Sequence, residues 1–356
     1  MILMALDHTS LYWNQGRLHD EGLNGLYQTG ASWGQFFTRF LSHPCAPGFI
    51  FISGLALFIS MERQTQKKKT LLLQNLHYLL RGITLVALDF ILINRLGWTF
   101  GVLACIGVCM MVFTLLRFLP SSLILAASMG LLIAHPFLAP IWKPDTLAGS
   151  YLTHVLTGTI RLKKNLAVLY PVIPWIGIMG MGFGFARYLL PLWVKGKILL
   201  TSKIFFISGI MLLGLFFPIK LCTGGFYGDC PSYQGIFSQG FWLLSKYPPS
   251  LAFFSWNMGL LCIIMGILFG LENTKYRYLN FLKILGTFGQ VPLFFYVVHR
   301  YFYKLFPSIT GTLREHSLLT TYIVWIAGLI PLYFLCQWYA GKYFRSSQKT
   351  SPFTRC

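Results

Sequence analysis

Charged residues are scarce in this sequence, and acidic residues are the scarcest of all. Only 11% of the 356 residues are charged and 55% are hydrophobic, whereas a typical soluble domain has roughly 25% charged residues. Asp and Glu number 9 against 29 Lys and Arg, which gives a formal net charge of +20. This composition excludes an ordinary soluble domain and indicates an integral membrane protein.

The excess of basic residues does not indicate a nucleic-acid-binding protein. Lys and Arg lie mostly between apolar segments, and no surface pattern of interleaved aromatic and basic residues is present. Basic residues in short loops orient membrane helices and attract anionic lipid headgroups. We therefore expect membrane lipids as partners and no nucleic acid.

Several familiar site patterns are also missing. Cys105 and Cys109 lie in an apolar segment without a nearby His or acid, so we predict no metal site. No nucleophile elbow is present, and the segment 286–292 lacks the Lys and the preceding strand of a phosphate-binding loop. Cys222 and Cys230 share one loop, and a disulfide between them requires that loop to lie outside the cytoplasm.

Apolar segments dominate what is present. About 20 apolar residues cross the hydrocarbon core as a helix. The segment 1–13 is shorter, and we interpret it as the outer half of a helix whose beginning is missing. The other segments are 44–61, 79–94, 98–116, 122–142, 168–190, 204–218, 251–271, 284–305 and 318–339. These segments predict an all-α fold, a polytopic membrane helix bundle of about 10 transmembrane helices, in a single domain over residues 1–356.

The distribution of basic residues predicts the orientation of these helices. Alternating the spans from a cytoplasmic start places most Lys and Arg inside, together with the tail from Lys342. The C-terminus is therefore predicted to be cytoplasmic. Arg161, Lys163 and Lys164 are the exception in an outer loop, and an interfacial amphipathic helix would explain them.

Polar residues with catalytic potential gather at the predicted outer side. Asp7 and His8 lie in the first apolar segment, and Arg39 and His43 precede the second. Adjacent residues on a helix point in different directions, so we expect Asp7 to contact Arg39 rather than His8. The functional interpretation is that His8 or His43 acts as a general base or as a nucleophile. The structural alternatives are a helix-end hydrogen bond for His8 and a helix cap for His43.

Three further ionisable residues lie within apolar segments. Asp89 should face the bundle interior and contact an Arg or His, because an unpaired charge there is costly. His135 and His299 lie near the outer ends of their spans, where a hydrogen-bonded interior histidine is favoured over catalysis. Glycines at 177, 180, 182 and 184 indicate close helix packing.

Five stretches resemble bacterial membrane proteins related to lysosomal heparan-α-glucosaminide N-acetyltransferase. They are LMALDH at 3–8, Arg39 with HPCAPGFIF at 43–51, YPVIPWIG at 170–177, KYPPSL at 246–251 and the segment 286–299. The resemblance implies that acetyl-CoA donates an acetyl group from the cytosol to an amino sugar on the far side of the membrane. It also implies a bacterial inner membrane location and is compatible with a homodimer.

This sequence differs from the pattern of the family at two places. The family's catalytic histidine stands in a sequence like His-Ala-Ser-Trp, and here Gly30 precedes Ala31, Ser32 and Trp33. We take His8 and His43 as substitutes for that histidine. The family's opening Ser-Ile-Asp and Arg-Gly are absent, so we expect that the chain begins late.

The leading hypothesis is a transmembrane acyltransferase that uses acyl-CoA and a sugar or glycan acceptor. His8 or His43 would act as base or acyl carrier, and Arg39 would stabilise the oxyanion. Asp7 would orient or balance these cations. The candidate substrate-binding residues are Asp89, His299, Trp33 and Trp175.

Two alternatives belong to other classes of function. A transporter or flippase for a glycan or lipid-linked sugar would use Asp89, His135 and His299 as a proton relay. No inverted repeat or pair of broken helices supports it. A structural scaffold would leave the outer histidines unexplained.

Overall fold

The computed structural model describes residues 1–23, 28–138, 146–163, 165–223, 235–272 and 280–348. Within these residues the chain is mostly helical, with one small sheet. It divides into two compact units. The first unit comprises residues 1–18, 31–45 and 274–356, and the second comprises residues 19–30 and 46–273.

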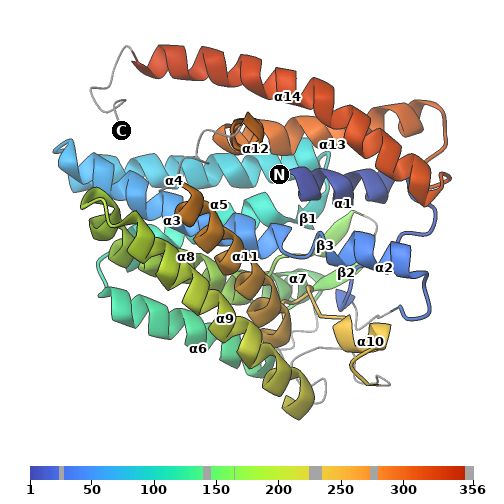
Figure 1. The fold of residues 1–356 in the computed structure, drawn as a ribbon, viewed down its shortest axis with the longest axis horizontal. Helices are drawn as coiled ribbons and strands as arrows, with labels where there is room; N and C mark the ends of the chain where they lie inside the picture. The colour runs from blue at the N-terminus through green and yellow to red at the C-terminus, as the bar shows by residue number, and fades with distance from the viewer. Residues whose placement is uncertain (24–27, 139–145, 164, 224–234, 273–279, 349–356) are drawn as a thin grey trace. The chain divides into compact units, whose positions relative to one another are not determined.

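The first unit is built from helices at both ends of the chain. They are α1 (Ile2–Trp13), α2 (Trp33–Phe40), α12 (Asn280–Gln290), α13 (Pro292–Ile309) and α14 (Leu318–Gln348). α1 packs beside α13 and α14 (Figure 1). α12 and α13 meet at a 91° bend, with Pro292 at the start of α13. Proline is tolerated there because the first N–H groups of a helix have no intrahelical partner.

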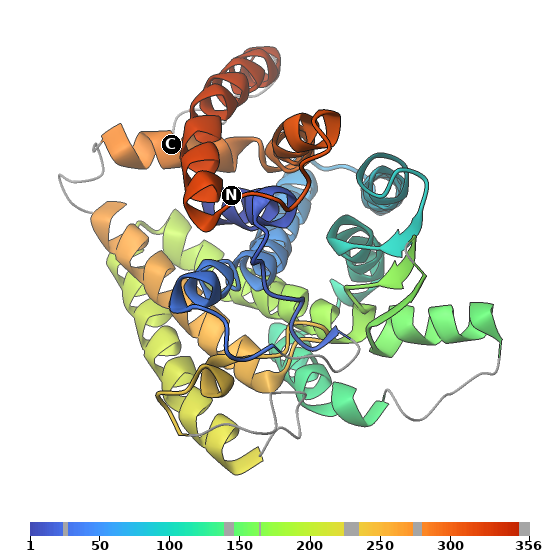
Figure 2. The ribbon, with the colours of Figure 1, turned by 90° about the vertical axis from the view of Figure 1, so that its right-hand side faces the viewer.

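The second unit holds the remaining helices. They are α3 (Cys45–Gln66, its first residue in the first unit), α4 (Leu71–Leu88), α5 (Val102–Leu116), α6 (Ser121–Leu138), α7 (Leu147–Thr157), α8 (Val172–Val194), α9 (Ile198–Thr223), α10 (Gln239–Trp242) and α11 (Leu251–Glu272). A π-helical turn, Asp89–Ile93, extends α4. α9 and α11 run side by side, as Figures 1 and 2 show, and α6 packs on α8.

The second unit also contains a small three-stranded sheet, which the prediction of an all-α fold did not include. It comprises β1 (Trp98–Phe100), β2 (Ile160–Lys163) and β3 (Leu166–Val168), in the order β1-β3-β2. β1 is parallel to β3, and β2 is antiparallel to it. The interfacial helix predicted around Arg161 and Lys163 is wrong, because both residues lie on β2. Apolar and basic residues alternate there with the period of a strand.

Glycines bring α3 and α8 into backbone contact. A Cβ atom built at Gly54 would come closer than 3.0 Å to the carbonyl oxygen of Met179, and one at Gly182 would meet Phe51 in the same way. Small residues let helix backbones approach in lipid, where van der Waals packing drives helix association. The prediction that the 177–184 glycines serve helix packing is therefore confirmed at this crossing.

Within the described residues, seven helices are long and apolar enough to cross a membrane, or eight if the bent pair α12–α13 is one span. The predicted count of about 10 is therefore not reached. α1 has 12 residues and is only about 18 Å long. α5 has 15 residues because β1 and Gly101 occupy the positions before it.

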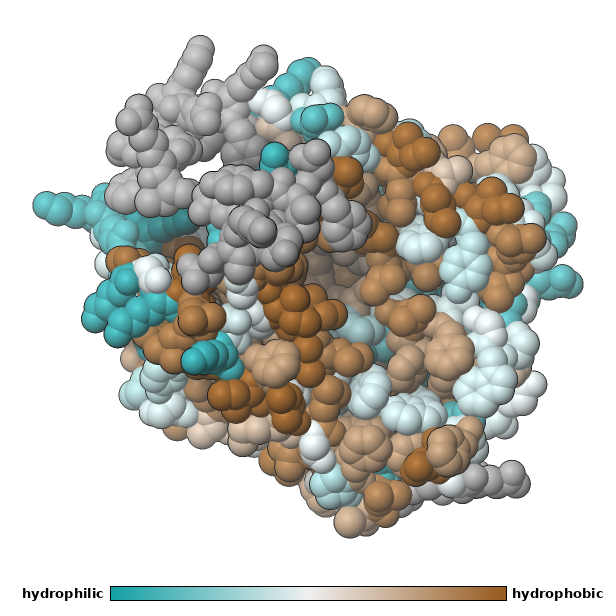
Figure 3. All heavy atoms as spheres, viewed as in Figure 1, coloured by the Kyte–Doolittle hydropathy of each residue, from teal (hydrophilic) through white to brown (hydrophobic). Residues whose placement is uncertain are grey.

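Apolar side chains cover much of the surface. Figure 3 shows brown, hydrophobic residues across the visible face. On α9, Ile207 and Met211 are 57% and 63% exposed. Such exposure on spanning helices is the pattern expected of residues that face lipid acyl chains. The protein is an integral, multi-pass membrane protein, as its composition predicts.

Cys230, the suggested partner of Cys222, lies outside the described residues.

Candidate active site

Helix α1 presents its two ionisable residues to different partners. Successive residues on a helix are about 100° apart, so Asp7 and His8 cannot share one neighbour. Both are half-buried. Their contacts are formed within the first unit.

The Asp7 carboxylate lies between two arginines. Its Oδ1 atom is 2.7 Å from Nη1 of Arg39 and 2.8 Å from Nη1 of Arg17. The side chains are nearly buried, with exposed fractions of 14% for Asp7, 3% for Arg39 and 7% for Arg17. The expected Asp7–Arg39 contact is therefore present.

The loop that carries Arg17 is held by a pair of amide side chains. Asn14 Nδ2 donates to Gln35 Oε1 at 2.6 Å, and Gln35 Nε2 donates to Asn14 Oδ1 at 3.0 Å. This pair connects the end of α1 to α2. Arg17 was not predicted as a partner of Asp7, because nothing in its local sequence separates it from the other charged residues of this polar loop.

His8 contacts His299 of α13. His8 Nδ1 lies 2.7 Å from His299 Nε2, and the two rings stack with centroids 4.9 Å apart. His299 is fully buried, and its Nδ1 contacts the carbonyl oxygen of Phe295. A carbonyl can only accept, so His299 carries its proton on Nδ1, and its Nε2 accepts from His8. Neutral His8 then has a free electron pair on Nε2.

Aromatic and basic side chains surround this histidine pair. The Tyr296 ring meets the His8 ring edge-on at 6.2 Å. Arg300 Nη1 donates to the Tyr296 hydroxyl at 3.3 Å. Arg300 also acts electrostatically on His8, as does Asp7 with the opposite sign. The pair thus consists of one fully buried and one half-buried ring, beside arginines and one carboxylate.

His43 occupies a different position in the first unit. It is 2% exposed and lies in the turn between α2 and α3, with its ring 5.6 Å from the ring of Phe40. Its backbone N–H donates to the Phe40 carbonyl. The histidine in contact with His8 is therefore His299, which the sequence analysis had assigned to substrate binding.

The two tryptophan candidates differ in burial. Trp33 begins α2, is 48% exposed and stacks against Phe37. Trp175, in the second unit, is completely buried and lies 5.0 Å from the ring of Tyr170. Its Nε1 has no hydrogen-bond acceptor among the described residues. A buried indole N–H normally finds a partner, so Trp175 is a candidate donor to a bound molecule.

Asp89 also lies in the second unit and caps a neighbouring helix. Its Oδ2 accepts from the backbone N–H groups of Gly101 at 2.9 Å and Ala104 at 3.0 Å, at the start of α5. These N–H groups, at the positive end of the α5 dipole, stabilise the carboxylate. The Arg or His partner that the sequence suggests stays a prediction. Burial, helped by the charge of Asp89, raises the pKa of Tyr151 to about 12, so that phenol stays neutral at pH 7.

Two of the stretches that carry the family resemblance meet in the second unit. The hydroxyl groups of Tyr170 and Tyr247 are 3.5 Å apart, and their rings pack edge to face. The carbonyl oxygen of Glu21 accepts from the N–H groups of Lys246 and Tyr247. Glu21 and Lys246 are 3% and 4% exposed. The burial of these two charged residues was not predicted, because their sequence context is that of an ordinary loop.

Residues 21–216, more than half of the chain, match the family model described as heparan-alpha-glucosaminide N-acetyltransferase, catalytic. The chain belongs to this family. Membership implies a membrane-bound acetyltransferase and confirms the resemblance of the sequence. No curated protein matches the chain.

The matched region divides the candidate residues of this N-acetyltransferase family member. Arg39, His43, Asp89, Trp33 and Trp175 lie inside it, whereas Asp7, His8 and His299 lie outside. The contacts of Arg39 with Asp7 nevertheless connect the matched region to α1 within one unit.

Proposed function

We propose that the chain works as one acyltransferase domain over residues 1–356. It takes an acetyl group from acetyl-CoA at the cytoplasmic face of a bacterial inner membrane. The acceptor is an amino or hydroxyl group of a sugar or glycan at the outer face. Family membership supports acetyl transfer, and the observation that carries the site assignment is the His8–His299 contact beside the Asp7–Arg39 pair.

His8 has the chemistry of the reacting group. With its Nδ1–H donated to His299, its Nε2 electron pair can take the proton of the acceptor as the acceptor nitrogen or oxygen attacks the thioester carbonyl. The C–S bond then breaks and CoA leaves as the thiol after protonation. Alternatively, Nε2 attacks first and carries the acetyl group before passing it on. His43 is the second candidate for either role.

The arginines fit the charge that develops during transfer. Attack on the thioester places negative charge on the carbonyl oxygen, and a preorganised cation stabilises it. Arg39 and Arg17 share one carboxylate, and each guanidinium has five donors. Asp7 orients them in this proposal. Trp33 and Trp175 are proposed as substrate contacts, whereas the contacts of Asp89 are those of a helix cap.

The contacts in the structure support the proton relay of the transporter hypothesis less than they support the acyltransferase. His135 Nδ1 lies 2.9 Å from the carbonyl oxygen of Leu132 on its own helix, and Asp89 caps α5. Both side chains therefore contact backbone groups of helices, which stabilises the fold and does not connect one relay residue to the next. Family membership points to acetyl transfer, so we favour the enzyme.

The experiment is acetyl transfer in proteoliposomes. Radiolabelled acetyl-CoA is supplied on one side and glucosamine or a glycan on the other, and labelled acceptor is counted. We expect His8→Ala to abolish transfer while thermal stabilisation by acetyl-CoA persists. His43→Ala is made in parallel. Full activity in both well-folded variants would refute a histidine mechanism. Movement of a labelled glycan across the membrane without any acyl donor would favour a transporter. Size-exclusion chromatography of the same sample tests the proposed homodimer.

A further inference from the structure

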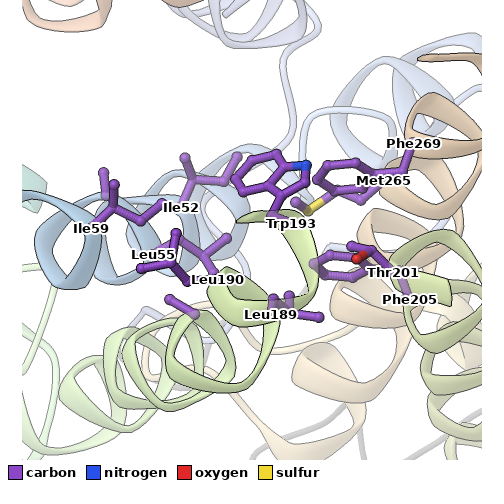
Figure 4. A pocket seen from close by; sticks show the side chains of 12 residues that line it. Ile52, Leu55, Ile59, Leu189, Leu190, Trp193, Thr201, Phe205, Met265 and Phe269 are labelled. Atoms are coloured by element: carbon purple, nitrogen blue, oxygen red, sulfur yellow. The ribbon is translucent and has the colours of Figure 1, made fainter. Parts of the chain in front are cut away.

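An apolar cavity of about 240 Å³ lies inside the second unit, and none of the residues of the proposed function lines it. It is enclosed by α3, α8, α9 and α11. Figure 4 shows Trp193 of α8 between the aliphatic side chains of α3 and the group formed by Phe205, Met265 and Phe269.

The lining restricts the occupant to hydrocarbon. The lining side chains that the structure describes are aliphatic, aromatic or thioether groups apart from Thr201. The Thr201 hydroxyl already donates to the carbonyl oxygen of Lys197. A polar ligand would lose its hydrogen bonds to water without replacement. The cavity is larger than the roughly 150 Å³ engineered cavity that binds benzene, so it has room for part of an acyl chain.

The cavity opens toward the surface of the spanning helices. Ile52 and Trp193, two of its lining residues, are 47% and 42% exposed. α3 and α8 both belong to candidate membrane spans. Whatever enters past these residues therefore comes from the bilayer rather than from water.

Three lysines are close in sequence to two of the lining residues, Trp193 and Thr201. The turn that joins α8 to α9 carries Lys195 and Lys197, both exposed, and Lys203 follows on α9. Trp193 lies two residues before this turn and Thr201 one helical turn after it. The nearest acids in sequence are Glu62 and Glu272, each three residues beyond a lining residue of α3 or α11. The three lysines outnumber these acids, and a phosphate group is the headgroup chemistry that they favour.

We propose that this cavity is a specific lipid site. One acyl chain of an anionic phospholipid fills it, and the phosphate of that lipid lies against Lys195 and Lys197. The inference is independent of acetyl transfer, because none of the residues of the proposed active site lines the cavity.

The test is photolabelling of the delipidated, full-length protein in detergent. The probe is phosphatidylglycerol with a diazirine on one acyl chain, and labelled peptides are mapped by mass spectrometry. We expect adducts on the lining residues of α3, α8 and α11. Ala56 is exposed and lines the cavity, so the larger side chain of Ala56→Phe would occupy part of it. The acyl chain would then bury less apolar area against the cavity wall, and labelling should fall about tenfold.

The matched control is Ala127→Phe, the same substitution at an exposed position of α6 outside the cavity. It should leave labelling unchanged. Lys195→Gln with Lys197→Gln should remove the preference for phosphatidylglycerol over phosphatidylcholine. Ala56→Met serves if Ala56→Phe does not fold.

Three results would overturn the proposal. The first is labelling spread equally over exposed α9 residues such as Ile207. The second is equal labelling by the zwitterionic lipid in the unaltered protein. The third is displacement of the probe by palmitoyl-CoA more readily than by phosphatidylglycerol, which would make the cavity a site for a long-chain acyl donor.

Discussion

The Nδ1 atom of His8 lies 2.7 Å from Nε2 of His299, although 291 positions separate the two residues in the chain. The contact joins a helix at the start of the chain to one near its end. It also defines the protonation of both rings, since the Phe295 carbonyl holds the proton of His299 on Nδ1. In the proposed mechanism, His299 would therefore act on the reaction through His8, as a positioning residue.

The first prediction concerns this pair. His8→Ala should reduce kcat about 10²- to 10⁴-fold, the usual contribution of a general acid–base group. His299→Phe should reduce kcat less and leave KM for acetyl-CoA nearly unchanged, because it removes the acceptor that orients His8. Steady-state kinetics of labelled acetyl transfer measures both constants.

The control for this pair is His154→Gln. His154 lies on α7, and its Nδ1 contacts the Ser150 carbonyl of the same helix, so its loss should not change kcat. Equal losses of activity in all three variants would mean that the effect of His8→Ala is not specific to the pair.

The second prediction concerns Asp7. Asp7→Ala leaves two nearly buried guanidinium groups without their shared carboxylate, and breaking a buried ion pair in this way costs about 3–5 kcal/mol. The melting temperature in detergent should fall by several degrees. Adding Arg39→Met to Asp7→Ala should restore part of the loss, because one of the two guanidinium groups that contacted Asp7 is then removed.

Glu315→Gln is the matched control, since Glu315 is an exposed acid of the same unit. Its melting temperature should match that of the unaltered protein. An Asp7→Ala variant as stable as Glu315→Gln would show that solvent screens the Asp7 contacts.

The third prediction concerns the cap that Asp89 forms on α5. Asp89→Ala removes the acceptor for the N–H groups of Gly101 and Ala104. A buried group left without its partner costs about 1–3 kcal/mol. Thermal unfolding should detect the loss, and amide hydrogen exchange at these two residues should accelerate. Unchanged exchange at both amides would disprove the cap.

The fourth prediction compares two glycines on spanning helices. At Gly54 an added Cβ meets the backbone of Met179, whereas at Gly214 it meets nothing within 4 Å. Gly54→Ala should therefore destabilise the protein, while Gly214→Ala should be neutral or stabilising, because Ala is favoured over Gly in helices by about 1 kcal/mol. Melting temperatures of the two variants, measured side by side, test this. A Gly54→Ala variant as stable as Gly214→Ala would contradict the close approach.

The sequence predicted the family, the helical membrane class and the Asp7–Arg39 contact. Composition and hydrophobic run length are local quantities, and they place helices such as α8 and α11 within a few residues. The Asp7–Arg39 prediction succeeded because helix geometry directs adjacent side chains apart, which left Arg39 as the natural counter-ion.

The sequence did not predict the sheet, the bend before α13 or the His8–His299 contact. β2 has four residues, too few for its alternation to stand out from the basic loop around it. The bend at Val291–Pro292 lies within a continuous apolar run, which hydrophobicity alone predicts as one span. The histidine contact depends on tertiary packing between the two ends of the chain, and a single sequence carries no signal for it.

The backbone contact of α3 with α8 has a mechanical consequence. At Gly54 and Gly182 the main chains themselves touch, so no layer of flexible side chains lies between them to accommodate sliding. Shear motion in proteins proceeds through small shifts of interdigitated side chains, and it is blocked where main chain meets main chain. The two helices should therefore move as one rigid body. Any conformational change during turnover would then occur at other helix–helix contacts.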